Sequence, residues 1–472
     1  MAYKDIASPA FSITARISIR NFPGQLAKVV KLMGDEGVSL AEMTLLASDF
    51  HYKHREITMH CKNEAHAERI IKLLKERDDI LFESYTDDVF EMHKGGKLSI
   101  EPKLYLKTRD QLSQAYTPGV ARICTHIANN PDATFDYTMR GNTVAVITDG
   151  TAVLGLGDIG PRAGLPVMEG KAMLFKQFSG LNAVPICLDI RDTHKIIDTI
   201  AYLSPSFGGI NLEDISAPRC FEIETELQKR LDIPVFHDDQ HGTACVVLAG
   251  LLNALKVTGK KMSDLKIVIS GVGAGGVAIA KTLNAAGAGN IVPCDSEGIV
   301  YRGRRSGMNS MKEEILQFAN KDNEMGTPIN ALKGASVFIG VSRPGIIHRE
   351  DLLGMAKDPI IFALANPVPE IMPDEAKGIA RIIATGRSDF ANQVNNVLCF
   401  PGIFKGALQC RATKITENMR LAAANAIAES IPENELNEEN IIPDPFNMGV
   451  PKRVAEKVME AAILDGVARI TD

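Results

Sequence analysis

The sequence lacks the cysteine patterns of a disulfide-bonded or thiolate-metal protein. Its eight cysteines are scattered at positions 61, 124, 187, 220, 245, 294, 399 and 410, and none forms a CxxC pair. That spacing is typical of free thiols in a reducing compartment. The first residues, MAYKDIASPAFSITARI, lack a charged stretch followed by an apolar one, which argues against a signal peptide. We therefore expect a cytoplasmic protein.

Long apolar runs and basic clusters are missing as well. No stretch approaches the roughly 18 uninterrupted apolar residues of a membrane span. A formal net charge of −6 and the lack of a block rich in Lys and Arg argue against nucleic acid as a partner. The 472 residues, with 45% hydrophobic and 23% charged side chains, are instead typical of a globular protein with more than one domain.

The first 95 residues have the pattern of a small α/β domain. Residues 11–19 alternate strictly between apolar and polar side chains, which predicts a strand. A turn at 21–24 precedes a helix whose apolar face begins at Leu26 and ends near Gly37. Further strands are expected at 39–47, 56–61 and 80–90, with a second helix over 67–74 and a polar linker at 93–97. The resulting order β-α-β-β-α-β predicts a ferredoxin-like domain.

This domain resembles an ACT domain, a small-molecule regulatory module found on many metabolic enzymes. The resemblance rests on the turn Asn21–Leu26 and on the order of elements. It implies that backbone groups near Gly24 contact an effector. The same turn could instead only shape the fold or a dimer interface.

Two acidic pairs, Glu213-Asp214 and Asp238-Asp239, each close a largely apolar segment. Such segments predict buried strands, so both pairs are expected at strand carboxyl ends, where open parallel sheets bind ligands. Carboxylates gathered in a cleft stay ionised only beside positive charge. Oxygen ligands favour Mg²⁺ or Mn²⁺. The alternative is a pair of solvated acidic loops.

A dinucleotide site is predicted at the run Gly271-Val272-Gly273-Ala274-Gly275-Gly276. This GxGxxG follows an apolar strand at 265–270 and precedes a helical run. Asp295 closes the next apolar segment, as expected of the residue that binds the ribose hydroxyls. A carboxylate there repels a 2′-phosphate and favours NAD. NADP stays possible because the run 302–305 contains three arginines, which could also be a solvated face.

Many motifs resemble the malic enzyme family, in its short prokaryotic form. They extend over about 105–465, and the resemblance implies a metal-binding domain at 96–240 and a doubly wound, Rossmann-type NAD-binding domain with a C-terminal helical segment at 241–472. The motifs are Tyr116–Val120, Thr148–Gly150, Gly155–Asp158, Leu165–Lys171, Asn211–Asp214, His237–Thr243, the GxGxxG, Ala365–Pro367 and Asn395–Gly402.

The resemblance implies a role for each matching residue. Lys171 would be the general base, paired with Asp238, and Tyr116 the general acid beside it. Glu213, Asp214 and Asp239 would bind the divalent metal. Asn366 and Asn396 would contact the substrate carboxylates, with Asn366 also at the cofactor; Gly271, Gly273, Gly276 and Asp295 would hold the dinucleotide. One position departs from the family, because Ala152 stands where larger members have a substrate-binding arginine.

We therefore expect a homo-oligomeric, metal-dependent enzyme that decarboxylates (S)-malate oxidatively to pyruvate. Two alternatives remain: a malolactic-type enzyme, which keeps NADH bound and yields lactate, and a catalytically silent metabolite sensor. The retained acidic and basic residues argue against the sensor. An amino-acid dehydrogenase would not need the carboxylate cluster.

Overall fold

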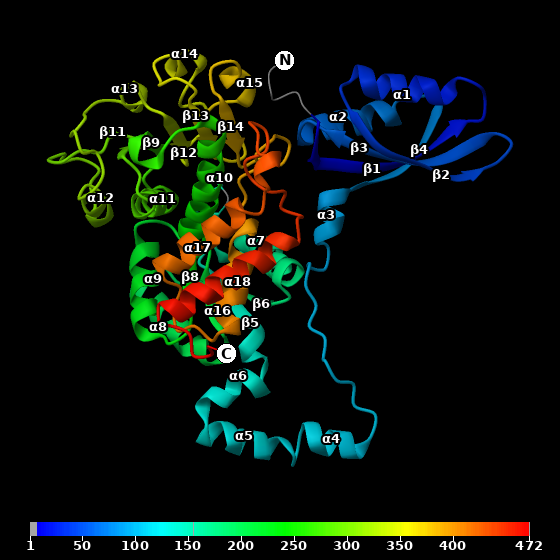
Figure 1. The fold of residues 1–472 in the computed structure, drawn as a ribbon. Helices are drawn as coiled ribbons and strands as arrows, with labels where there is room; N and C mark the ends of the chain where they lie inside the picture. The colour runs from blue at the N-terminus through cyan, green and yellow to red at the C-terminus, as the bar shows by residue number, and fades with distance from the viewer. Residues whose placement is uncertain (1–6, 154, 472) are drawn as a thin grey trace. The chain divides into compact units, whose positions relative to one another are not determined.

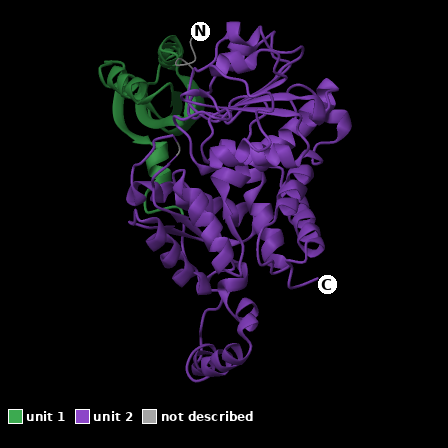
Figure 2. Cartoon of the chain, turned by 90° about the vertical axis from the view of Figure 1, so that its left-hand side faces the viewer, with its two compact units in different colours: residues 1–97 green, residues 98–472 purple. Residues whose placement is uncertain are grey.

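The computed structural model describes residues 7–153 and 155–471. The chain forms two compact units, residues 1–97 and 98–472, shown in different colours in Figure 2. The smaller unit has a buried apolar cluster of its own. Separate cores are what two independently folding parts of one chain need.

Residues 1–97 form a four-stranded antiparallel sheet with two long helices (Figure 1). The elements are β1 (Ser8–Arg20), α1 (Gln25–Asp35), β2 (Ser39–Ser48), β3 (Tyr52–Cys61), α2 (Glu64–Lys75) and β4 (Ile80–Asp87), and the sheet order is β2-β3-β1-β4. Alternate residues of β1, among them Ile13 and Ile17, are buried with Val29 and Met33 of α1. The two-residue period of the sequence therefore marks the face of the sheet that packs on the helices.

The last strand ends earlier than the sequence predicts. The prediction covered residues 80–90, but β4 stops at Asp87 and α3 (Asp88–His93) follows. The side chain of Asp87 accepts hydrogen bonds from the backbone N–H groups of Val89 and Phe90. This N-cap satisfies the free donors of the first turn and converts the chain from strand to helix.

Residues 98–472 contain two parallel sheets. The first has the order β6-β5-β7-β8 and consists of β5 (Thr143–Thr148), β6 (Asn182–Cys187), β7 (Gly209–Leu212) and β8 (Val235–His237), connected by α7 (Pro161–Ser179), α8 (Thr193–Leu203) and α9 (Arg219–Arg230). Every residue of β5, β7 and β8 is buried, which explains their continuous apolar runs. Leu212 and His237 are neighbours in the sheet, so the segments after β7 and β8 start at one edge.

The second sheet has six strands in the order β11-β10-β9-β12-β13-β14. They are β9 (Lys266–Ser270), β10 (Asn290–Asp295), β11 (Gly298–Ile299), β12 (Val337–Gly340), β13 (Ile360–Ala363) and β14 (Ile382–Thr385), and only β11 runs antiparallel. The strand order reverses at β9, and ligands of doubly wound sheets bind at such a reversal. The short strands β11 and β14 are not predicted from the sequence.

A group of long helices completes this unit: α10 (Thr243–Thr258), α11 (Ala274–Ala285), α16 (Phe400–Gln409), α17 (Glu417–Ala428) and α18 (Gly449–Leu464). One helical stretch among the described residues, Asp238–Thr258, is long and apolar enough to cross a membrane by length and composition, and 67% of its apolar window is buried inside the fold. Residues 244–251 are all buried. This helix is therefore part of the core.

Three short helices form an arm: α4 (Arg109–Ala115), α5 (Val120–Asn129) and α6 (Thr134–Tyr137). In Figure 1, α4 and α5 extend away from both sheets, whereas Phe135 of α6 packs against the core. None of their residues is buried. Val120, Ile123, Cys124 and Ile127 nevertheless share one face of α5 by their spacing. The apolar face of α5 is thus not covered by the described part of the chain.

Candidate active site

Both acidic pairs lie at the carboxyl edge of the first sheet. Glu213 and Asp214 directly follow β7, while Asp238 and Asp239 follow β8 and open the π-helical turn η5 (Asp238–Gly242). Glu213, Asp214 and Asp238 are at most 4% exposed. The predicted position at strand ends is therefore found in the structure, and the alternative of two solvated loops does not hold.

Lys171 of α7 reaches into this acidic cluster. Its Nζ donates to Oδ2 of Asp238 at 2.6 Å and lies 2.9 Å from Oε1 of Glu213. Asn396 also donates to Oδ2 of Asp238. The ammonium group stands 4.3 Å from the ring centre of Phe400, so an aromatic face covers the charge. Lys171 is thus a buried cation that two carboxylates hold in one position.

The surroundings of Lys171 set its protonation state. Burial alone would lower the pKa of Lys171, but the carboxylates of Asp238 and Glu213 outweigh burial and raise it above its usual range. Burial raises the pKa of Glu213 to about 7 and that of Asp238 to about 7, against the opposing effect of Lys171. Without further positive charge, the site therefore holds a proton on the lysine and pushes the carboxyl groups toward their neutral forms.

Three carboxylates of the cluster can share one cation. Oxygen atoms of Glu213, Asp214 and Asp239 lie within 4.8 Å of one another. The side chain of Asn211 donates to Glu213, and its Oδ1 is a buried oxygen without a hydrogen-bond partner among the described residues. Hard oxygen donors in this arrangement fit Mg²⁺ or Mn²⁺. The predicted ligand set is thus brought together in space.

The two acidic pairs do not divide as neatly as the sequence predicts. Asp238 binds Lys171, while Oδ2 of Asp239 accepts the backbone N–H of Asp214 at 2.8 Å, so the neighbours do point apart. The separation arises where β8 gives way to η5. Glu213, however, contacts Lys171 as well as the other carboxylates. One carboxylate therefore links the lysine to the candidate metal site.

The glycine-rich loop lies beside this cluster. A Cβ atom on Gly276 would stand 1.8 Å from the backbone oxygen of Gly271, and one on Gly271, where φ is +102°, would stand 2.6 Å from that of Val341. Both positions require glycine. A Cβ atom on Gly275 would lie 3.2 Å from the backbone oxygen of Asp239. The start of α11 thus borders the acidic site.

Asp295 stands at the end of β10, as predicted, but it is not a free carboxylate. Arg304 donates to both of its oxygens, and Lys312 Nζ lies 2.7 Å from Oδ2. Burial would raise the pKa of Asp295, but these two cations lower it to about 2. Arg302, by contrast, donates to three backbone carbonyls and is occupied by the fold.

Two predicted residues lie outside the Lys171 cluster. Asn366 follows β13 and is exposed. Its backbone oxygen would be 2.8 Å from a Cβ atom on Gly155, which places it beside the loop between β5 and α7. Tyr116, at the end of α4, is 65% exposed. The expected position of Tyr116 beside Lys171 is not found, because the arm that carries Tyr116 has no buried residue to hold it against the site.

The sequence assigned no role to several residues of the site, although three of them lie within the quoted motifs. Asn211 donates to Oε2 of Glu213 at 2.8 Å, and the two-residue spacing on a strand could have indicated this. His237 is buried, and burial lowers its pKa to about 4. Arg219 binds Asp149 and reaches Thr151, next to Ala152. Phe400 and Arg219 come from distant helices, so no local signal could have placed them.

Two family models match the chain. Residues 95–228 match "Malic enzyme, N-terminal domain", and residues 240–463 match "Malic enzyme, NAD binding domain". The NAD-dependent malic enzyme of Geobacillus stearothermophilus is 52% identical over 98% of this chain and 96% of its own length. The bifunctional malic/malolactic enzyme of Bacillus subtilis is 54% identical over 82% of this chain and 95% of its own.

Solved structures agree with these matches. The crystal structure of an NAD-dependent malic enzyme from Thermotoga maritima has a TM-score of 0.77 and 49% identity, and the match covers 79% of this chain and 99% of that one. The crystal structure of a malic enzyme from Pyrococcus horikoshii also has a TM-score of 0.77, with 48% identity over 82% of this chain and 92% of that one.

Proposed function

The chain belongs to the malic enzyme family, and from this premise we propose that it converts (S)-malate to pyruvate and CO₂ while NAD is reduced. The observation that carries the proposal is the buried group of Lys171, Asp238 and Glu213, which borders the glycine-rich loop. An acid–base group beside a nicotinamide site is what the oxidation of a hydroxy acid needs.

The donor set at the acidic site fits a divalent cation. Glu213, Asp214 and Asp239 would hold it, since three carboxylates this close repel one another unless a cation lies between them. Such a cation supplies positive charge that polarises the oxygens of the substrate and offsets the charge of Glu213. Mg²⁺ and Mn²⁺ both suit these ligands.

Lys171 is proposed as the general base. When the hydroxyl proton of malate moves to Nζ, hydride leaves C2 for the nicotinamide, and oxaloacetate forms. Oδ2 of Asp238 accepts a hydrogen bond from Nζ of Lys171 and one from Asn396, so Asn396 holds the carboxylate that holds Nζ in place. Without a bound cation, the carboxylates of Asp238 and Glu213 keep Nζ of Lys171 protonated. A cation that offsets the charge of Glu213 would lower the pKa of Lys171, so that Nζ could accept the hydroxyl proton of malate. Asn396 and Asn366 are proposed to bind the substrate carboxylates.

Tyr116 is proposed as the acid that protonates C3 after CO₂ leaves, and we propose that it acts in a second copy of the chain. Its exposure and the uncovered apolar face of α5 support an arm that packs on a partner. A two-fold dimer would bring each arm to the opposite site. This assignment also accounts for the expected homo-oligomer.

Mixing two inactive variants tests this arrangement. Tyr116→Phe and Lys171→Ala chains, unfolded and refolded together, should regain about one quarter of wild-type activity, because half of the dimers are mixed and each mixed dimer has one intact site. If Tyr116 serves its own chain, every site carries one defect and no activity returns.

Asp295 and the 52% identity to the NAD-dependent malic enzyme of Geobacillus stearothermophilus support NAD as the cofactor. NADP-dependent relatives exist as well, such as the NADP-dependent malic enzyme of Escherichia coli, which is 47% identical over 83% of this chain and 53% of its own length. Steady-state kinetics with malate, Mg²⁺ or Mn²⁺, and either cofactor test the function. Formation of reduced cofactor and pyruvate supports it, and the absence of turnover with both cofactors and both metals contradicts it.

A malolactic reaction is the second candidate, supported by the 54% identity to a bifunctional malic/malolactic enzyme. In that reaction NADH stays bound and reduces the product to lactate. Product analysis separates the two: free NADH with pyruvate indicates oxidative decarboxylation, whereas lactate without net NADH indicates the malolactic route.

Residues 1–97 are proposed to act as an ACT-like regulatory domain. Their β-α-β-β-α-β order and the left-handed Gly24 at the start of α1 support this. An effector would alter turnover only by binding two conformations with different affinity. Screening small metabolites for a change in malate kinetics, in the full chain and in residues 98–472, tests the proposal.

A further inference from the structure

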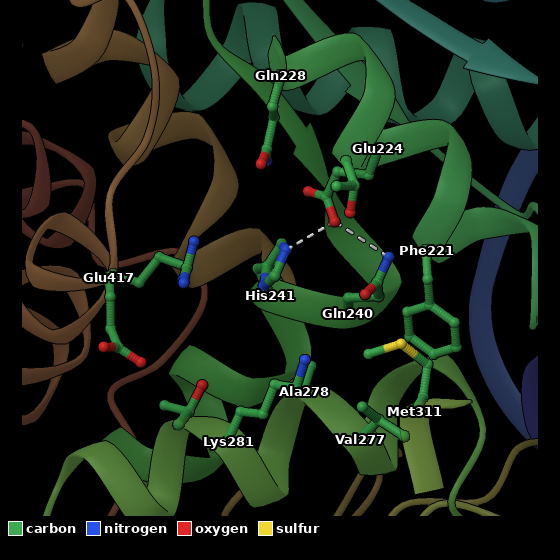
Figure 3. A pocket seen from close by; sticks show the side chains of 13 residues that line it. Phe221, Glu224, Gln228, Gln240, His241, Val277, Ala278, Lys281, Met311 and Glu417 are labelled. Carbon is green, nitrogen blue, oxygen red and sulfur yellow. Dashed lines mark hydrogen bonds and ion pairs between the residues drawn. The ribbon is translucent and has the colours of Figure 1, made fainter. Parts of the chain in front are cut away.

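A pocket that neither Lys171 nor the acidic cluster lines lies next to η5. Its volume is about 190 Å³, and α9, η5, α11 and α17 surround it. Figure 3 shows side chains from these elements turned toward one opening. The space corresponds to about six water molecules, which suits a small organic ligand rather than a nucleotide.

One side of the pocket is cationic. Arg420 of α17 lines it, and its guanidinium forms no hydrogen bond or ion pair with the part of the chain that the structure describes. Lys281 of α11 also lines the pocket, and it pairs with Glu314 at 2.7 Å. A partly enclosed guanidinium is suited to a carboxylate or another planar anion.

No carboxylate among the described lining residues forms an ion pair with Arg420, although the charges of Glu224 and Arg420 attract one another. Glu224 uses both carboxylate oxygens within the protein: Oε1 accepts the backbone N–H of His237 at 3.0 Å, and Oε2 lies 3.2 Å from Nε2 of Gln240 and 2.9 Å from Nε2 of His241. Glu417 is exposed at the rim. Arg420 is therefore left for an external anion.

The other side of the pocket is apolar. Phe221 of α9, Val277 and Ala278 of α11, and Met311 line it. In Figure 3, Phe221, Val277 and Met311 gather on the side opposite Glu417. A bare inorganic anion would leave these side chains without contacts. An anion with a short hydrocarbon body would contact both sides.

The pocket shares its walls with the catalytic machinery. Glu224 holds Gln240 and His241 of η5 and the backbone of His237 at the end of β8, and η5 begins with Asp238 and Asp239. Helix α11 begins in the glycine-rich loop, where Gly275 adjoins Asp239. A ligand between His241 and α11 would therefore contact both the turn that carries the catalytic carboxylates and the helix of the dinucleotide site.

We propose that this pocket binds a small organic anion, with its carboxylate on Arg420 and Lys281 and its hydrocarbon part on Phe221, Val277 and Met311, and that binding changes malate turnover through η5. The coupling is reciprocal: a ligand that alters malate affinity is itself bound differently when malate is present. This site is separate from the ACT-like domain.

Binding of butyrate to the full-length enzyme tests the site. Butyrate has one carboxylate and a short chain, and calorimetry in the presence of malate and Mg²⁺ without NAD keeps the catalytic site occupied and idle. Butyrate should bind more tightly than acetate. Arg420→Gln should weaken butyrate binding about tenfold, as expected for a lost charge-assisted hydrogen bond, and Lys281→Gln should weaken it less.

Matched variants separate charge from folding. Arg420→Lys keeps the charge and should retain most of the affinity. Lys229→Gln removes a charge from the exposed end of α9, outside the pocket, and should change nothing. Equal butyrate affinity in wild type and Arg420→Gln, or inorganic phosphate binding more tightly than butyrate, would overturn the proposed ligand class.

Kinetics test the coupling. Without butyrate, Arg420→Gln should oxidise malate like wild type, since it touches no catalytic residue. With butyrate, the KM or kcat of wild type should shift, while that of Arg420→Gln should stay constant. Butyrate that binds at Arg420 yet leaves both constants unchanged would refute the proposed link through η5.

Discussion

Glu213 occupies the central position among the acidic residues. It contacts Lys171 on one side and the candidate metal ligands Asp214 and Asp239 on the other. Its charge therefore bears on both the base and the cation. A substitution of Glu213 is therefore expected to affect both the lysine and the metal site.

Metal affinity should depend on pH through Glu213. Burial raises the pKa of Glu213 to about 7, so in the metal-free protein about one tenth of this carboxyl is ionised at pH 6 and about nine tenths at pH 8. Only the ionised form binds a cation. Calorimetric titration should therefore show Mg²⁺ binding about tenfold more weakly at pH 6 than at pH 8.

The variant Glu213→Gln provides the control for this prediction. It should bind Mg²⁺ weakly at both pH values, without the tenfold difference. A wild-type affinity that stays constant between pH 6 and pH 8 would show that the carboxyl is ionised throughout and that the prediction is wrong.

Asp295 should set the choice between NAD and NADP. Its carboxylate neutralises Arg304 and Lys312 and would repel a 2′-phosphate. In Asp295→Asn the shape persists, but the two cations lose their partner and can accept the phosphate. The ratio of kcat/KM for NAD to that for NADP should fall by about tenfold or more.

Arg305→Gln is the matched control for Asp295→Asn. Arg305 belongs to the same loop, but its side chain is exposed. Its replacement should leave the cofactor ratio within a factor of about two. A larger change would indicate that the exposed Arg305, rather than Asp295 and its partners, determines the choice of cofactor.

At the level of elements, the junction from β9 to α11 is the most constrained part of the dinucleotide site. Gly276→Ala places a methyl group against the backbone oxygen of Gly271, only 1.8 Å away in the present geometry. The helix must move, so we expect a loss of about 2 kcal/mol in the free energy of unfolding and at least tenfold weaker NAD binding. Urea denaturation and cofactor titration measure the two effects.

Gly273→Ala offers a comparison within the same loop. No atom lies within 4 Å of a Cβ atom there, and the residue at φ −85° needs no left-handed conformation. Its unfolding free energy should stay close to wild type, so any loss of NAD binding reflects the ligand alone. Equal stability of the two alanine variants would contradict the steric argument at Gly276.

At the level of the whole molecule, the two units should be separable. Residues 1–97 bury Ile13, Ile57, Leu74 and their neighbours in a cluster of their own. A chain that begins at Leu98 should therefore fold and oxidise malate at a rate within a few-fold of the full chain, but without the effector response that we propose for residues 1–97.

Two outcomes would contradict this prediction. If the shortened chain keeps every effector response, the regulatory role of residues 1–97 is wrong. If it folds, by circular dichroism, but lacks activity, the first unit contributes to catalysis. The anion pocket gives an internal reference, because its response to butyrate should survive the truncation.

The sequence by itself determines the local part of this protein. Period-two and period-3.6 patterns predict β1 and α1, since burial of one face requires those periods, and continuous apolar runs predict the buried strands β7, β8, β9 and β10. The positions of the GxGxxG and of the two acidic pairs are predicted in the same way, because the apolar runs define the strand ends at which these motifs lie. Short elements such as β11 and β14 have too few residues for a pattern.

Only the tertiary structure determines which side chains meet at the ends of these strands. It brings Lys171 of α7 between Glu213 and Asp238, covers it with Phe400 of α16, and occupies Asp295 with Arg304 and Lys312. It also leaves Tyr116 exposed on an arm, which the motif alone placed beside the lysine. The physical reason is that charge pairing and burial depend on distances between residues far apart in sequence, and local patterns carry no information about those distances.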